Sequence, residues 1–210
     1  IKELHLERFA ELYSPYFPAI YQTTPSYAAH PLYPGLAGAI IERNTAELPR
    51  VEFYWSGSPE LIVTKGYHAN FGGQYEVANT ALDLYEKFKV KRMIVLAAYA
   101  KEGPEVCCAC SSPKTLTEVK RYGIEPGYEG PFLGFSALAF GLGILRGIEG
   151  LCLFGKTTPN YIEPEYPDPN AAKTVLEKLS SILGISLDLS KLVEKDQEGP
   201  ALRQPEHMYT

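Results

Sequence analysis

The sequence predicts an α/β fold in which helices cover both faces of a central sheet, so that the domain has three layers. Three successive elements carry this prediction. Phe135–Leu145 is apolar on nearly every side, which is typical of a buried helix, and residues 151–154 form a short apolar run of strand length. Pro169–Leu183 is an amphipathic helix, with Asp168 as its N-cap and Gly184 at its end. Helix, buried strand and helix in succession is the order expected of a three-layer α/β/α sandwich.

Four short strands are predicted in the N-terminal half, where β-branched and aromatic residues lie between turn residues. They cover residues 8–13, 19–23, 51–55 and 61–65. Residues 36–41 are apolar and leave strand and helix as open alternatives. Trp55 is the one tryptophan of the chain, and we expect it to pack in the core.

Two helices and two strands are predicted in the middle of the chain. Residues 74–88 form a helix whose apolar stripe consists of Val77, Ala81, Leu84 and Phe88. Residues 93–98 are the most apolar run of the chain and predict a central strand. Residues 106–110 predict a further strand, and residues 113–122 a helix with Ser112 as its N-cap.

Composition and charge exclude several classes of protein. The chain has 210 residues, is 45% hydrophobic and carries a formal net charge of −5, so nucleic acid is not an expected partner. No apolar run reaches the length of a membrane span. The four cysteines, Cys107, Cys108, Cys110 and Cys152, fall in predicted core strands with a spacing that fits no zinc motif. We therefore expect buried free thiols, no metal, no cofactor and a cytoplasmic location.

The loop of residues 66–73 is the one candidate ligand site. It follows the end of a predicted strand, which is where open α/β sheets bind ligands, and its glycines precede a helix N-terminus that attracts anions. Its candidate residues are Tyr67, His68, Asn70, Gly72 and Gly73. A plain strand-to-helix turn is the open alternative, because the loop has neither a full glycine fingerprint nor a lysine paired with Ser or Thr. No catalytic motif was found anywhere in the chain.

Three runs of the sequence resemble the proteasome assembly chaperone family, in particular its archaeal members. They are FAELYSPYFP from Phe9, LRGIEGLCLFGKT from Leu145 and PDPNAAKTVLEKLSSILGISLDLSKL from Pro167. The resemblance implies a phosphorylase/hydrolase-like mixed sheet with one antiparallel strand, a non-enzymatic chaperone and a homo-oligomer. It also implies a strand and a glycine-rich turn upstream of Ile1 that the sequence does not contain. We expect one α/β domain over residues 1–192 and a tail, helical and then flexible, over residues 193–210.

The last three residues, Met208, Tyr209 and Thr210, are the candidate partner-binding site. A hydrophobic residue, a tyrosine and any residue bearing the free carboxylate look like the proteasome-docking tail of proteasome activators and several assembly chaperones. The resemblance therefore implies α-type proteasome subunits as partners, reached by a carboxylate and an aromatic ring. Two alternatives remain open: a hydrolase or nucleoside-phosphorylase-like enzyme with its site near residues 66–73, and an interaction module with a different partner.

Overall fold

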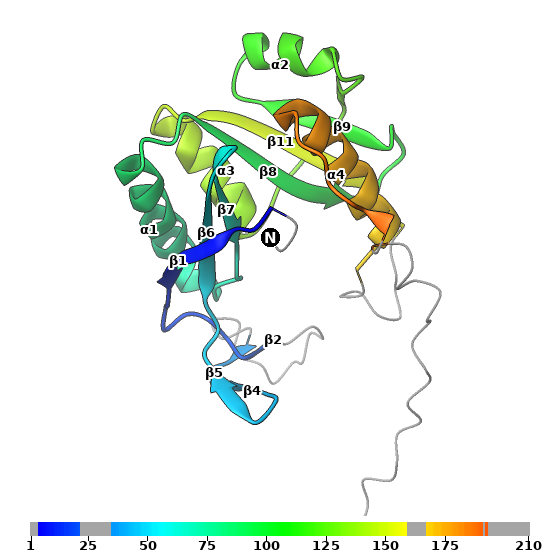
Figure 1. Ribbon diagram of the computed structural model, residues 1–210. Helices are drawn as coiled ribbons and strands as arrows, with labels where there is room; N and C mark the ends of the chain where they lie inside the picture. Colours follow the sequence, from blue (N-terminus) through cyan, green and yellow to red (C-terminus); the bar gives the residue numbers. More distant parts are fainter. Residues whose placement is uncertain (1–3, 22–34, 159–166, 191, 193–210) are drawn as a thin grey trace, which may run out of the picture.

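The computed structural model describes residues 4–21, 35–158, 167–190 and 192 (Figure 1). Its larger sheet has the strand order β10–β9–β11–β8. The strands are β8 (Arg92–Tyr99), β9 (Val106–Cys110), β10 (Glu125–Pro126) and β11 (Glu149–Lys156). β11 pairs with β8 in parallel and with β9 antiparallel, which confirms the predicted mixed sheet. Two strands run in each direction, because β9 and β10 are antiparallel to β8 and β11. The resemblance to the chaperone family implied a single antiparallel strand.

The prediction that residues 93–98 form a central strand of the sheet is wrong. In the described sheet β8 lies at the end and β11 lies inside, although residues 93–98 are the more apolar run. β11 buries six consecutive residues, as expected of a strand covered on both faces. In contrast, Leu96 in β8 is 41% exposed. Apolar composition therefore identified two sheet strands but ranked them in the wrong order.

Helices cover both faces of this sheet (Figure 1). Successive side chains of β11 point to opposite faces of the sheet. Leu151 and Leu153 pack with Val119 of α2 (Pro113–Lys120) and Val175 of α4 (Pro169–Leu183). Cys152 and Phe154 face the opposite way, toward Phe140 of α3 (Phe135–Leu145). Together with α1 (Gln74–Lys87), which packs along α3, these helices give the predicted three-layer arrangement.

Local capping signals predicted the first residues of α2 and α4 and the end of α4 correctly, whereas α2 ends at Lys120 and not at residue 122 as predicted. The Ser112 hydroxyl accepts a hydrogen bond from the Thr115 N–H, and the Asp168 carboxylate accepts one from the Ala171 N–H. Gly184 closes α4 with a φ of 65°, a left-handed conformation that glycine adopts without strain. The bounds of α3 and α4 are those read from the sequence.

The burial of two helices differs from the prediction. Of the 11 residues of α3, Phe135, Ala139 and Gly143 are buried, whereas Leu145 is 82% exposed. In α1 the buried stripe includes Val77 and Ala81 but turns away from Phe88, which is half exposed.

Within the ranges that the structure describes, no helix combines the length and the apolar character needed to cross a membrane.

A second, antiparallel sheet has the order β1–β6–β7. Its strands are β1 (Glu7–Leu12), β6 (Val51–Gly57) and β7 (Glu60–Lys65). Val51 and Phe53 of β6 are fully buried against α1. Trp55, expected in the core, is 45% exposed, so that prediction is wrong. It stands near the β6–β7 turn, beyond the cluster that α1 forms with this sheet.

Two short antiparallel pairs complete the described strands. β2 (Ile20–Tyr21) pairs with β3 (Gly35–Leu36), and β4 (Ile40–Glu42) with β5 (Thr45–Glu47). Of the ambiguous run of residues 36–41, Leu36 belongs to β3 and Ile40 and Ile41 to β4, and residues 37–39 lie in neither strand. The β4–β5 hairpin, which was not predicted, turns at Arg43 and Asn44, both with positive φ, and projects away from the two sheets (Figure 1).

Candidate functional site

The predicted partner-binding tail, Met208, Tyr209 and Thr210, lies outside the described residues and stays a prediction. The other candidate, the loop of residues 66–73, is described in full. It runs from the end of β7 through a 3-10 turn (Phe71–Gly73) into α1, as the sequence predicted.

The chain itself fills the space beside the loop glycines. The Tyr67 hydroxyl donates to the Pro18 carbonyl over 2.7 Å, and the Asn70 N–H donates to the Tyr16 carbonyl over 2.7 Å. A Cβ on Gly73 would lie 2.1 Å from Cγ of Tyr16. Glycine at position 73 is thus explained by the approach of the Tyr16 ring, without any ligand.

The same loop leads into α1 and packs against the N-terminus of α3. A Cβ on Gly134 would lie 2.7 Å from Cε1 of His68, and one on Gly66 would lie 2.7 Å from the Phe135 ring. Asn70 Oδ1 is buried without a hydrogen-bond partner in the described part of the chain. The loop therefore brings its candidate residues together, namely Tyr67, His68, Asn70, Gly72 and Gly73. They form a packing contact between the loop, the segment around Tyr16 and the N-terminus of α3.

Replacing Gly73 by Ala is expected to lower the free energy of unfolding by about 1–3 kcal/mol, because the new methyl group would displace the Tyr16 ring. Gly72→Ala is the matched control, since a Cβ there would lie 3.7 Å from Tyr16, an ordinary contact. Urea denaturation of the two variants measures the difference. Equal stabilities would contradict the packing of Tyr16 against this loop.

The four cysteines are free thiols in β9 and β11. Cys108 and Cys110 share one side of β9, as predicted, with their Sγ atoms 3.8 Å apart. Burial, followed by the neighbouring Cys110, raises the pKa of Cys108 to about 12. Burial likewise raises the pKa of Cys107 and of Cys152. Protonated thiols are poor nucleophiles and poor metal ligands, and the described residues contain no group of three or more potential ligands that could hold a metal ion.

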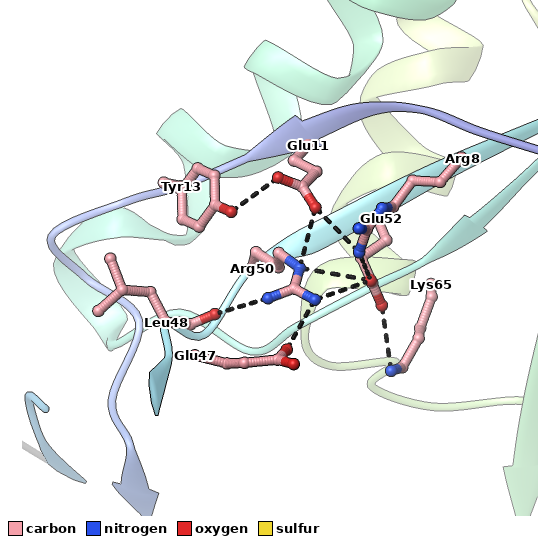
Figure 2. A network of polar contacts seen from close by, with 8 residues as sticks. All are labelled: Arg8, Glu11, Tyr13, Glu47, Leu48, Arg50, Glu52 and Lys65. Atoms are coloured by element: carbon pink, nitrogen blue, oxygen red, sulfur yellow. Dashed lines mark hydrogen bonds and ion pairs between the residues drawn. The ribbon is translucent and has the colours of Figure 1, made fainter. Parts of the chain in front are cut away.

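A polar network on the β1–β6–β7 sheet was not predicted (Figure 2). Because Val51 and Phe53 face α1, Glu52 lies on the opposite side of β6, yet it is only 6% exposed. Its carboxylate is 2.7 Å from Arg8, 3.1 Å from Lys65 and 3.3 Å from Arg50. The remaining members, which surround the two arginines, are Glu11, Tyr13, Glu47 and Leu48.

The electrostatics of this network are those of a structural ion-pair cluster. Burial alone would raise the pKa of Glu52, but hydrogen bonds from Arg8 and Lys65 outweigh it and lower the pKa to about 2. Arg50 donates to the Leu48 carbonyl and pairs with Glu47 and Glu11 as well. The network links β1, β6, β7, Glu47 of β5 and the segment that follows β5.

An open pocket of about 330 Å³ lies beside the network, lined by Tyr13, Ala46, Glu47, Leu48 and Arg50. Figure 2 shows Tyr13 and Leu48 at the same end of the network, away from Lys65. The walls of the pocket combine apolar side chains with the ion pair of Glu47 and Arg50. Such a lining suits an inserted apolar group better than a small charged molecule. The alternation of charged and apolar residues around Glu52 was the sequence signal that could have indicated this face.

Comparisons with protein families, with curated proteins and with solved structures each match most of the chain. The profile of the PAC2 family matches residues 1–199. A curated relative, an uncharacterized protein of Methanocaldococcus jannaschii, is 29% identical over 163 residues, which is 74% of this chain. The chain spans 61% of that relative's length.

Three solved structures share the fold. The first is Pyrococcus furiosus PbaB, described as an archaeal proteasome activator, with a TM-score of 0.74 and 27% identity over 93% of this chain and 80% of that one. The second is P. furiosus PbaA, an archaeal homolog of proteasome-assembly chaperone, with a TM-score of 0.71 and 20% identity over 94% and 78%. A proteasome-assembly chaperone homologue of Mycobacterium tuberculosis has a TM-score of 0.64 and 15% identity over 97% and 86%.

Proposed function

The chain belongs to the PAC2 family, and from this premise we propose that it is a non-enzymatic chaperone of proteasome core-particle assembly. It docks on α-type subunits through the tail Met208–Tyr209–Thr210 and acts as a homo-oligomer in the cytoplasm. The observation that carries the proposal is the fold shared with PbaA and PbaB, which coincides with a terminal hydrophobic–Tyr–any sequence. Several tails on one oligomer would raise the affinity by effective concentration, because each tail alone must be ordered on binding.

A second candidate function is activation of an assembled proteasome. It is favoured by PbaB, the 27% identical structure that is described as a proteasome activator. Activation and assembly would use the same tail contact, but they act on different forms of the partner. The enzyme alternative receives less support, because Tyr16 accounts for the glycine at position 73 and burial keeps Cys107, Cys108 and Cys152 protonated.

Deleting Met208–Thr210 is expected to weaken binding to purified α-type subunits at least tenfold, roughly 1.4 kcal/mol. Tyr209→Ala should act in the same direction, since the ring supplies most of the apolar contact. Adding one glycine after Thr210 should also weaken binding, because it moves the carboxylate. Gln204→Ala is the control within the same tail. Binding is measured by pull-down and titration, and assembly by native gels of mixed α-type and β-type subunits.

Each result separates the candidates. Faster core-particle formation supports the chaperone, whereas faster peptide hydrolysis by a preassembled proteasome supports the activator. Binding that survives loss of the tail would overturn tail docking and move the contact to the folded surface. If neither form binds α-type subunits, the proteasome proposal itself fails.

A further inference from the structure

Helix α3 is apolar on all sides, but its own chain buries only one of them. The residues Phe135–Leu145 contain no charged side chain. Phe135, Ala139 and Gly143 are the buried ones, and they lie on one side of the helix. A helix that is hydrophobic all round is normally buried all round, because helix positions that face water usually carry charged or polar residues. The composition of α3 therefore indicates that its opposite side is covered as well.

This opposite side consists of Ala137, Gly141 and Leu145 and is called the outer face of α3 below. The three residues are spaced by four positions, so they follow one another along one side of the helix. Leu145 is 82% exposed and Ala137 is half-buried. A Cβ at Gly141 would meet no atom within 4 Å in the described part of the chain. The outer face thus has open space at its centre.

Helix α1 lies beside α3 and widens this surface (Figure 1). The Arg146 guanidinium, at the end of α3, donates to Asp83 over 2.6 Å and to Asn79 over 2.7 Å. Tyr75 precedes Asn79 by about one helical turn and is 62% exposed. A stable interface buries about 800 Å² per partner, which is more than one side of a short helix supplies. The second helix therefore adds area that an association through α3 needs.

The outer face is complementary to itself when two copies of α3 cross in opposite directions. A two-fold axis at Gly141 brings residues at equal distances before and after it into contact, so that Leu145 of each copy faces Ala137 of the other. A large side chain then meets a small one at two places, and glycine at the crossing lets the two backbones approach closely. No charge is buried, because α3 has none. This pattern favours a second copy, since each chain carries both the large group and the space for it.

We propose that the outer face of α3 is the surface through which two copies of this chain associate, with the two helices crossing in opposite directions at Gly141. Leu145 of each copy packs against Ala137 of the other. The inference rests on the self-association included in the proposed function and assigns it to a surface. The contact is separate from the tail, so self-association and proteasome docking can be tested independently.

Sedimentation velocity over a range of concentrations tests the surface. Gly141→Leu is expected to weaken self-association at least tenfold, because the new side chains would hold the two helices apart. In the separate chain the same side chain enters open space, and leucine favours a helix more than glycine does, so the fold is kept. Ala172→Leu is the matched control, since it adds a leucine at an exposed position of α4, on the opposite face of the sheet.

A size exchange tests the direction of the crossing. Ala137→Leu would set leucine against leucine at both contacts, and Leu145→Ala would set alanine against alanine, so each variant alone should weaken self-association. An equimolar mixture of the two should restore it, because the mixed pair again has leucine against alanine at both places. A role within one copy would not be rescued by mixing. Circular dichroism at dilutions where wild type is monomeric should show the same fold for every variant.

Three results would overturn the inference while leaving tail docking untouched. They are a monomeric wild-type protein, a Gly141→Leu variant that associates as well as Ala172→Leu, and a mixture of Ala137→Leu and Leu145→Ala that associates no better than either alone. Loss of α-subunit binding by Gly141→Leu with unchanged self-association would also overturn it and assign the outer face of α3 to the proteasome.

Discussion

Replacing Phe154 by Ala is expected to lower the free energy of unfolding by about 3–5 kcal/mol, among the larger losses for a single core side chain. Phe154 is 1% exposed on the inner strand β11, between the helix layers. Its ring stacks on Tyr128 with centroids 4.3 Å apart and contacts Phe132 edge to face at 5.1 Å. The substitution therefore removes buried area and two aromatic contacts and leaves a cavity.

Urea denaturation of Phe154→Ala and Leu145→Ala measures this effect against a surface control. Leu145 is also a large apolar residue, but it is 82% exposed, so its loss should change the free energy of unfolding by less than about 0.5 kcal/mol. A Phe154→Ala variant as stable as Leu145→Ala would contradict the position of β11 inside the sheet.

The features that the sequence predicted well depend on contacts within a few residues. The ends of α4 are an example, because the Asp168 cap and the Gly184 turn each act on their own helix turn. The alternation of Cys108 and Cys110 along one side of β9 is another, since it follows from the pleat of a strand alone.

The features that the sequence did not predict depend on pairings between distant segments. Both β8 and β11 are apolar, and only the strand order decides which of them lies at the end of the sheet. Trp55 follows a buried pattern along β6, but its exposure depends on where the cluster around α1 ends. Neither property is encoded in a short window of sequence.

The candidate site shows the same division. The position of the 66–73 loop between a strand and a helix could be predicted, whereas its neighbour Tyr16 could not, because that contact joins distant parts of the chain. The network around Glu52 was missed for a similar reason. Its charges come from β1, β5, β6, β7 and the segment between β5 and β6, and the register of the sheet places Glu11 and Lys65 beside Glu52.

Stability should depend on pH through Glu52. Its pKa is lowered in the folded protein from an ordinary 4.5 to about 2, because its hydrogen bonds to Arg8 and Lys65 outweigh the effect of burial. A carboxylate of this kind contributes stability above the unfolded pKa and loses it as the pH falls through the folded pKa. Allowing for solvent around Arg8 and Lys65, the contribution at neutral pH is about 2–3 kcal/mol.

Glu52→Gln is therefore expected to lower the free energy of unfolding by about 2–3 kcal/mol at pH 7, and the difference from wild type should shrink by roughly half between pH 5 and pH 3. Urea titrations at several pH values measure it, with Glu60→Gln, an exposed carboxylate at the start of β7, as the control that should stay within about 0.5 kcal/mol. A difference that stays constant down to pH 3 would show that the ion pairs of Glu52 do not stabilise the fold.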